Sequence, residues 1–183
     1  MQVKIIGAGL AGCEAALWLA DRGVQVELYE QKPAKYSPAH KSAGFAELIC
    51  SNSLKAERPD SASGLLKIEM KMMGSHLLDA AETARVAAGG ALAVDRDVFS
   101  AAVTEMVENH PNITVRREEV TALDESAPVL VASGPLTLFC PLCPERMLSP
   151  SALCNSTRAS LTLPTPSAAS AAPASQSWTH NSG

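Results

Sequence analysis

A glycine-rich hexapeptide near the N-terminus is the first stretch whose residue spacing suits ligand binding. It matches G-x-G-x-x-G and consists of Gly7, Ala8, Gly9, Leu10, Ala11 and Gly12. Between a strand and a helix, such glycines permit a tight turn, close approach of a diphosphate to the backbone, and close packing of helix on sheet. The N–H groups and positive dipole end of the helix then face the phosphates. The hexapeptide predicts a dinucleotide-binding turn; glycines kept only for turn geometry are the alternative.

A carboxylate at the expected distance supports the dinucleotide interpretation. Glu30 follows Gly12 by 18 residues and comes directly after a second strand-like run. At this position a carboxylate accepts hydrogen bonds from a ribose diol. It also repels a 2′-phosphate, so we do not expect NADP here. FAD and NAD both use this element; its place at the N-terminus and the later run VLVASGP at 129–135 favour FAD. The alternative for that run is any buried strand that ends at a Gly-Pro turn.

Cys50 is the third candidate. It follows the apolar run FAELI at 45–49 and precedes Ser51 and Asn52. Near a helix N-terminus its thiolate would be favoured, which would make it reactive. A small, inert hydrophobic residue is the alternative.

The elements that must position these residues alternate between strands and helices. We expect strands at 3–6, 24–29, 112–115 and 129–132, and helices at 10–22, 63–73 and 75–85. Residues 31–60 are expected to be rich in loops. The first helix should bury Ala15, Ala16, Leu19 and Ala20 and end at Gly23. This alternation predicts an α/β fold with a largely parallel sheet.

A further helix has its own cap and apolar stripe. Asp95 or Asp97 can serve as its N-cap. The stripe consists of Phe99, Val103, Met106 and Val107. Their spacing is that of one helix face.

Composition restricts the class of protein. The 183 residues carry a formal net charge of −4, which argues against a broad basic face for nucleic acid. There is no secretory signal pattern and no apolar run of the roughly 20 residues that a bilayer requires. Five irregularly spaced cysteines do not resemble a disulfide framework, so a reducing cytoplasm is expected. Cys140 and Cys143 form a CxxC, but a zinc site needs further ligands, so no metal is expected.

The composition changes abruptly after residue 138. Of the 45 residues at 139–183, 26 are Ser, Pro, Thr or Ala, and three are charged. Hydrophobic periodicity disappears there. We therefore divide the chain into a folded part at 1–138 and a disordered tail at 139–183. The tail is further hypothesised to be an out-of-frame product.

Several motifs occur in the order and spacing of one protein family. They are GAGLAGCEAA at 7–16, PAH at 38–40, FAELICSNSLKA at 45–56, AAGGALAVDRDVF at 87–99 and ASGPLT at 132–137. Residues 1–137 thereby resemble the N-terminal part of the TrmFO (Gid) family of methylenetetrahydrofolate-dependent tRNA (uracil-5-)-methyltransferases. The resemblance implies a Rossmann-type FAD-binding fold, here incomplete, because family members are much longer.

The resemblance also implies a reaction. Members methylate uridine 54 at C5 in the T-loop of tRNA, with FAD as cofactor, 5,10-methylenetetrahydrofolate as carbon donor and NADH or NADPH as reductant. Cys50 falls on the cysteine that the family uses for covalent chemistry. Arg96, in the VDR segment, matches a region placed beside the cofactor; a surface ion pair with Asp95 or Asp97 is its alternative. Two alternative functions remain: an FAD-binding remnant without catalysis, and a GidA-like tRNA-modifying flavoprotein.

Overall fold

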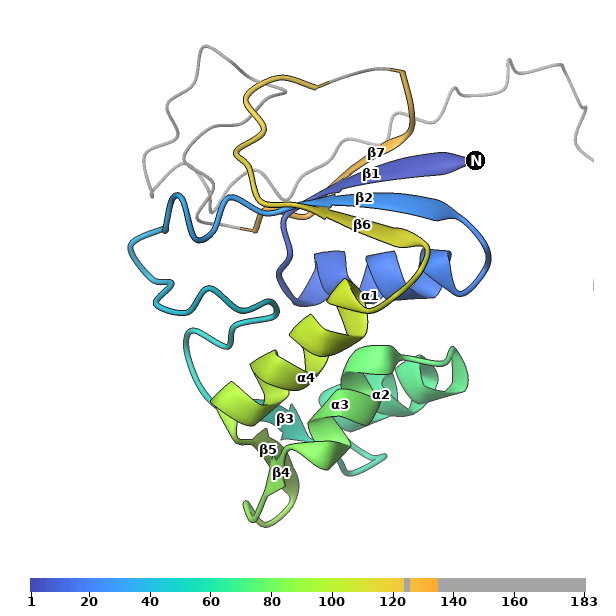
Figure 1. The fold of residues 1–183 in the computed structure, drawn as a ribbon. Helices are drawn as coiled ribbons and strands as arrows, with labels where there is room; N and C mark the ends of the chain where they lie inside the picture. The colour runs from blue at the N-terminus through green and yellow to red at the C-terminus, as the bar shows by residue number, and fades with distance from the viewer. Residues whose placement is uncertain (124–125, 135–183) are drawn as a thin grey trace, which may run out of the picture.

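The main sheet of this computed structural model, which describes residues 1–123 and 126–134, has four parallel strands. The tail at 139–183 and its CxxC lie outside the described residues. Figure 1 shows the strands side by side. Their order across the sheet is β6 (Ile113–Arg116), β2 (Gln25–Tyr29), β1 (Gln2–Ile6) and β7 (Val129–Val131). The predicted α/β fold with a parallel sheet is confirmed.

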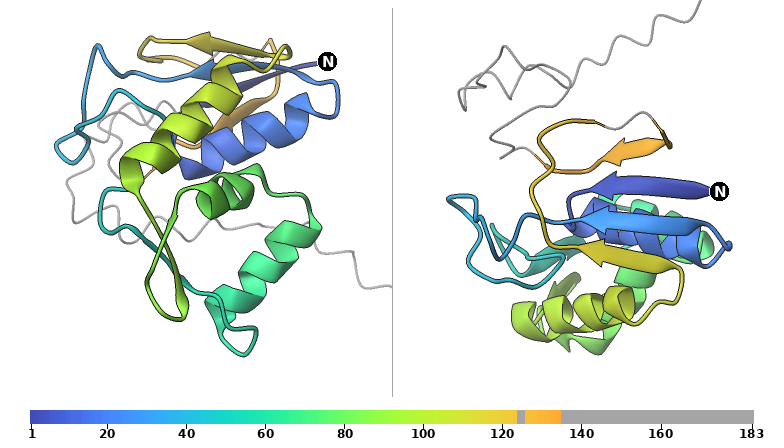
Figure 2. Two further views of the ribbon diagram at one scale, coloured as in Figure 1. Left: turned by 60° about the horizontal axis from the view of Figure 1, so that its bottom comes forward. Right: turned by 45° about the horizontal axis from the view of Figure 1, so that its top comes forward.

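One face of this sheet is covered by helices α1 (Leu10–Ala20) and α4 (Arg96–Glu108), as Figures 1 and 2 show. Alternate residues of the central strands point toward them: Val3, Ile5, Val26 and Leu28 are all buried. This period of two is what a strand with one covered face requires. These four side chains are therefore the sheet's contribution to the contact with the helices.

Helix α1 is where the predicted burial pattern needs correction. Its buried residues are Gly12, Cys13, Ala16, Leu17 and Ala20. Ala15 and Leu19, predicted to face inward, are only partly buried. Apolar residues surround the helix on nearly all sides, so the sequence indicates no single inward face. The helix ends near the predicted Gly23, whose φ of +77° allows the chain to reverse.

The other predicted helices are confirmed with small shifts at their ends. They are α2 (Ala62–Met72), α3 (His76–Thr83) and α4. Of the two candidate caps of α4, Asp95 is the one used, because its Oδ1 accepts the N–H groups of Asp97 and Val98 at 3.0 and 3.1 Å. Phe99, Val103 and Val107 are buried, and Met106 packs against the core.

A second, antiparallel sheet was not predicted. It contains β3 (Ser53–Ala56), β5 (Ala91–Val94) and β4 (Arg85–Val86), in the order β3-β5-β4. These strands are two to four residues long, too short to show alternation. Strand β5 is almost entirely buried, so it lacks a polar face that would mark it. Residues 31–60 are therefore less uniformly loop than expected.

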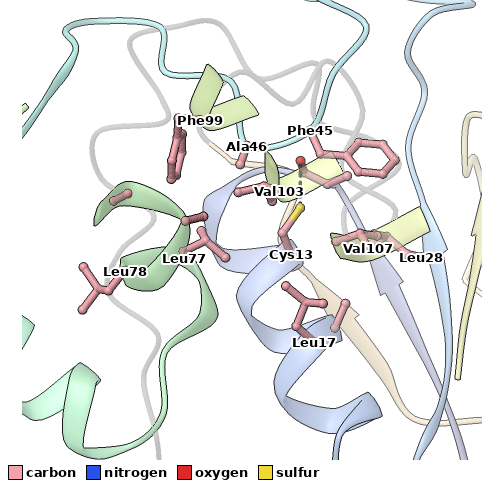
Figure 3. Close-up of a cluster of buried hydrophobic side chains, with 14 of the residues drawn as sticks. Cys13, Leu17, Leu28, Phe45, Ala46, Leu77, Leu78, Phe99, Val103 and Val107 are labelled. Atoms are coloured by element: carbon pink, nitrogen blue, oxygen red, sulfur yellow. Dashed lines mark hydrogen bonds between the residues drawn. The ribbon is translucent and has the colours of Figure 1, made fainter. Parts of the chain in front are cut away.

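One hydrophobic core connects the parallel sheet and its helices with the loop between β2 and β3. Figure 3 shows Cys13 and Leu17 of α1 beside Leu28, Val103, Val107 and the loop residues Phe45 and Ala46. Phe45 and Ala46 are fully buried. The loop between β2 and β3 is thus anchored in the core rather than free on the surface. Within the described residues, no helix is long and apolar enough to cross a bilayer.

Candidate dinucleotide site

A pocket opens where the carboxyl ends of β1, β2 and β7 meet. Its wall includes the turn after β1, Glu30 after β2, and Ala132, Ser133 and Gly134 after β7. The chain leaves β1 toward β2 on one side, while β7 pairs with β1 on the other. A crevice outside such a topological switch point is where open parallel sheets bind ligands.

The glycines of the turn have three different environments. Gly7 has a φ of +104°, and a Cβ added to it would lie 2.7 Å from the carbonyl oxygen of Ala132. A Cβ on Gly12 would lie 1.9 Å from the carbonyl oxygen of Gly7. A Cβ added to Gly9 would have no neighbouring atom within 4 Å, and Gly9 lines the pocket. Gly7 and Gly12 are therefore required by the fold, whereas Gly9 leaves space that a ligand can use.

Glu30 lines this pocket and is 8% exposed. Its Oε2 accepts the backbone N–H of Ala8 at 3.0 Å, and its Oε1 accepts the backbone N–H of Lys32 at the same distance. Each carboxylate oxygen can accept more than one hydrogen bond. Glu30 can therefore accept ribose hydroxyls while it keeps both backbone contacts.

The described part of the run VLVASGP, residues 129–134, reaches the pocket from the opposite side of β1. Lys4, Ile5 and Ile6 pair in parallel with the three residues of β7. The backbone N–H of Ala132 then donates to the carbonyl oxygen of Ile6 at 2.8 Å. Gly134 follows with a φ of +76°. The expected returning strand and turn are both present and lie against the glycine turn.

Six pocket residues from the loop after β2 have no role in the predicted site. They are Gln31, Lys32, Ser37, His40, Glu47 and Ile49. Ser37 is buried, and its Oγ lies 2.5 Å from Nδ1 of His40. The available signal was the family motifs PAH and FAELI, which contain three of the six. A motif alone does not show which of its residues face a ligand.

Charge in the pocket favours some ligands over others. Four carboxylates, those of Glu30, Glu47, Glu118 and Glu119, face one lysine, Lys32. Additional phosphate on the ribose would be repelled. A diphosphate in this pocket would have to be held by backbone N–H groups and the dipole of α1 rather than by cationic side chains.

Cys50 lies at the edge of the pocket rather than inside it. Its thiol is free and exposed, and its neighbour Ile49 lines the pocket. The expected helix N-terminus is wrong, because the next element after Cys50 is β3. The other cysteine among the described residues, Cys13, is fully buried, and burial raises the pKa of its thiol to about 12. Cys13 is therefore a packing residue.

Arg96 is the predicted site residue that the structure places apart. It is the exposed first residue of α4 and does not line the pocket. Its alternative, an ion pair with Asp95 or Asp97, is not formed within the described part of the chain either; Asp95 caps the helix instead. The described residues also contain no group of three or more His, Cys, Asp or Glu side chains arranged to hold a metal ion.

Comparison with known families agrees with this geometry. The sequence model of the family described as glucose inhibited division protein A matches residues 2–138. The chain belongs to this family.

The relatives and a solved structure extend the comparison. The chain is 56% identical over 137 residues to the methylenetetrahydrofolate–tRNA-(uracil-5-)-methyltransferase TrmFO of Anoxybacillus flavithermus, matching 75% of this chain and 32% of that protein. It is 58% identical to the TrmFO of Geobacter sulfurreducens over 74% of this chain and 31% of that protein. The chain thus spans about a third of these relatives. The structure of Aquifex aeolicus GidA shares the fold, with a TM-score of 0.53, 19% identity, and coverage of 67% of this chain and 20% of that one.

Proposed function

We propose that residues 1–138 form the N-terminal part of an FAD-binding domain. The observation that carries this proposal is the convergence of the glycine turn, Glu30 and residues 132–134 on one pocket. Gly9 provides space for a diphosphate, and Glu30 provides acceptors for a ribose. The acidic wall is compatible with FAD or NADH and disfavours a 2′-phosphate at this site.

The reaction to which this domain belongs is methylation of uridine at C5 in the T-loop of tRNA, in the cytoplasm. The support is identity above 50% to proteins named as methylenetetrahydrofolate–tRNA-(uracil-5-)-methyltransferases. Methylenetetrahydrofolate supplies the carbon, and FAD, recharged by NADH or NADPH, supplies the electrons.

Cys50 is the proposed nucleophile. C5 of uracil does not attack an electrophile until a nucleophile has added at C6, and a thiolate adds well. The exposure of Cys50 and the position of Ile49 in the pocket wall suit a base that reaches the pocket edge from outside. Arg96 is retained as a proposed cofactor contact that requires parts of the domain beyond the described residues.

The alternative function is an FAD-binding module that does not catalyse methylation. The residues matched here correspond to about a third of the length of the relatives. Both functions share the pocket but differ in turnover.

Two measurements on matched samples test these proposals. First, FAD is titrated into the 183-residue chain and binding is followed by quenching of flavin fluorescence. Second, residues 1–137 replace the aligned segment of the Anoxybacillus flavithermus relative, and 5-methyluridine is measured in tRNA. FAD binding by the chain together with an active chimera supports both the FAD-binding domain and the methylation reaction. FAD binding by the chain together with an inactive chimera identifies a module, and absence of FAD binding by the chain contradicts the proposal.

A further inference from the structure

An ion pair in the pocket wall links two segments that the proposed function uses separately. The Nζ of Lys32 lies 3.5 Å from Oε2 of Glu47, with the side chains 5% and 16% exposed. Both residues line the pocket. The same Nζ donates to the carbonyl oxygen of Gly44 at 2.7 Å. A buried charge is tolerated only with such partners, so Lys32 is fixed in place.

Glu47 uses its second oxygen to hold the loop. Its Oε1 accepts the backbone N–H groups of Lys41 and Ser42 at 2.9 and 3.1 Å. Burial alone would raise the pKa of Glu47, but these two hydrogen bonds and the charge of Lys32 outweigh it and lower the pKa. The ionised carboxylate therefore ties the backbone at 41–42, while Lys32 ties it at Gly44.

The same unit is connected to the ligand-binding groups. The backbone N–H of Lys32 donates to Oε1 of Glu30, the ribose acceptor. The backbone N–H of Ala46 donates to the carbonyl oxygen of Ala8 in the phosphate turn at 2.9 Å. From this double attachment the chain continues through Ile49, in the pocket wall, to the exposed Cys50.

We propose that Lys32 and Glu47 are positioning residues that hold residues 41–50, the thiol segment, across the edge of the pocket, so that a bound dinucleotide changes the reactivity of the Cys50 thiol. The proposal rests on the proposed dinucleotide site. It assigns to Lys32 a task beyond stability: the residue joins the ribose acceptor to the segment that carries the thiol. A purely structural ion pair would affect unfolding but not the response of Cys50 to ligand.

The experiment measures the rate at which iodoacetamide alkylates Cys50 in the 183-residue chain, with and without saturating FAD. Peptide mass spectrometry separates Cys50 from the other four cysteines. In the unchanged protein, FAD should slow alkylation of Cys50 about tenfold. This is the effect expected if bound FAD lowers the population of conformations in which residues 41–50 expose the thiol to about a tenth. Glu47→Gln and Lys32→Met should each reduce this effect to less than about twofold, measured at FAD concentrations that saturate each variant. The double variant should lose no more than either single variant, because the two residues act as one unit.

Lys71→Met is the matched control. It removes an ion pair with Glu82, at 2.7 Å, on exposed surface away from the pocket lining. This variant should keep the full effect of FAD on Cys50. Glu47→Gln conserves shape, so it provides a folded test even if Lys32→Met unfolds.

A ligand-free measurement separates this proposal from the proposed function. Hydrogen–deuterium exchange of peptides covering 41–50 should be faster in Glu47→Gln than in the unchanged protein, and unchanged in Lys71→Met. Exchange that is equally slow in Glu47→Gln overturns the positioning role, whether or not FAD binds. FAD binding without any change in Cys50 alkylation also overturns it and leaves the dinucleotide site intact. Failure of the unchanged protein to bind FAD rejects the proposed function instead.

Discussion

The carboxylate of Glu30 accepts a hydrogen bond from the backbone N–H of Ala8, 3.0 Å away. The bond joins the end of β2 to the glycine turn after β1. The two groups proposed to hold ribose and diphosphate are therefore aligned before ligand arrives, which lowers the ordering that binding must impose.

Replacement of Glu30 tests this alignment. Glu30→Ala removes an acceptor for ribose hydroxyls, and a hydrogen bond to a charged group contributes roughly 1.5–3 kcal/mol. FAD affinity should therefore fall by about one to two orders of magnitude. The loss of acceptors for two backbone N–H groups should also lower the free energy of unfolding. The measurements are an FAD titration and a urea unfolding curve.

The control for this variant is Glu27→Ala, in β2 just before Glu30 but outside the pocket lining. It should leave FAD affinity close to that of the unchanged protein. An unaltered FAD dissociation constant in Glu30→Ala would remove Glu30 from the site.

Gly9 and Gly12 should respond to substitution in opposite ways. Gly9→Val should keep the fold, because nothing lies within 4 Å of an added Cβ, but should abolish FAD binding by filling the space for the diphosphate. Gly12→Ala should destabilise the protein strongly, because its Cβ would meet a backbone oxygen at 1.9 Å. Thermal unfolding and flavin absorbance distinguish the two effects.

Gly90→Val is the control, since Gly90 also has open space around it and does not line the pocket. It should be neutral for FAD binding. If Gly9→Val retained its flavin, the cofactor would have to bind elsewhere.

The sequence predicted the glycine turn and Glu30 correctly as neighbours because both belong to a local pattern of strand, turn, helix and strand. It also predicted the parallel pairing through the repeated alternation of elements. It did not predict β3 and β5, because such short strands acquire their structure from pairing with each other rather than from their own periodicity.

The pocket wall formed by Lys32, Ser37, His40 and Glu47 was beyond sequence reasoning for a related reason. These residues lie in a loop whose path depends on burial of Phe45 and Ala46 in the core. A local pattern carries no information on such a long-range contact. The position of Arg96 outside the pocket lining could not be predicted either, because its motif does not indicate the direction of the helix start.

Cys13 should give the protein a specific sensitivity to alkali. Burial raises the pKa of its thiol from 9.0 to about 12. The folded protein keeps the proton while the unfolded chain loses it, so this contribution to stability is complete below pH 9 and is lost as the pH rises toward 12. Unfolding free energy measured between these values should fall less steeply in Cys13→Ala than in the unchanged protein. If the unfolding free energy depended on pH equally in Cys13→Ala and in the unchanged protein, the buried thiol would ionise as readily as in the unfolded chain.

Cys50 is tested for its chemical role in the chimera that carries residues 1–137 in the Anoxybacillus flavithermus relative. Cys50→Ala should still bind FAD and tRNA, because the exposed thiol contributes little to either surface, yet it should form no 5-methyluridine. Cys50→Ser should fail similarly, since a hydroxyl is far less ionised than a thiol near neutral pH. The measurement is incorporation of labelled carbon from methylenetetrahydrofolate into tRNA, with flavin content as the control for folding.

Cys13→Ala is the matched cysteine variant. It should keep methylation activity when it is assayed well below its unfolding temperature, since its stability is lower. Near-normal methylation by a flavin-replete Cys50→Ala enzyme would exclude the thiol as the nucleophile and leave Cys50 as an ordinary surface residue.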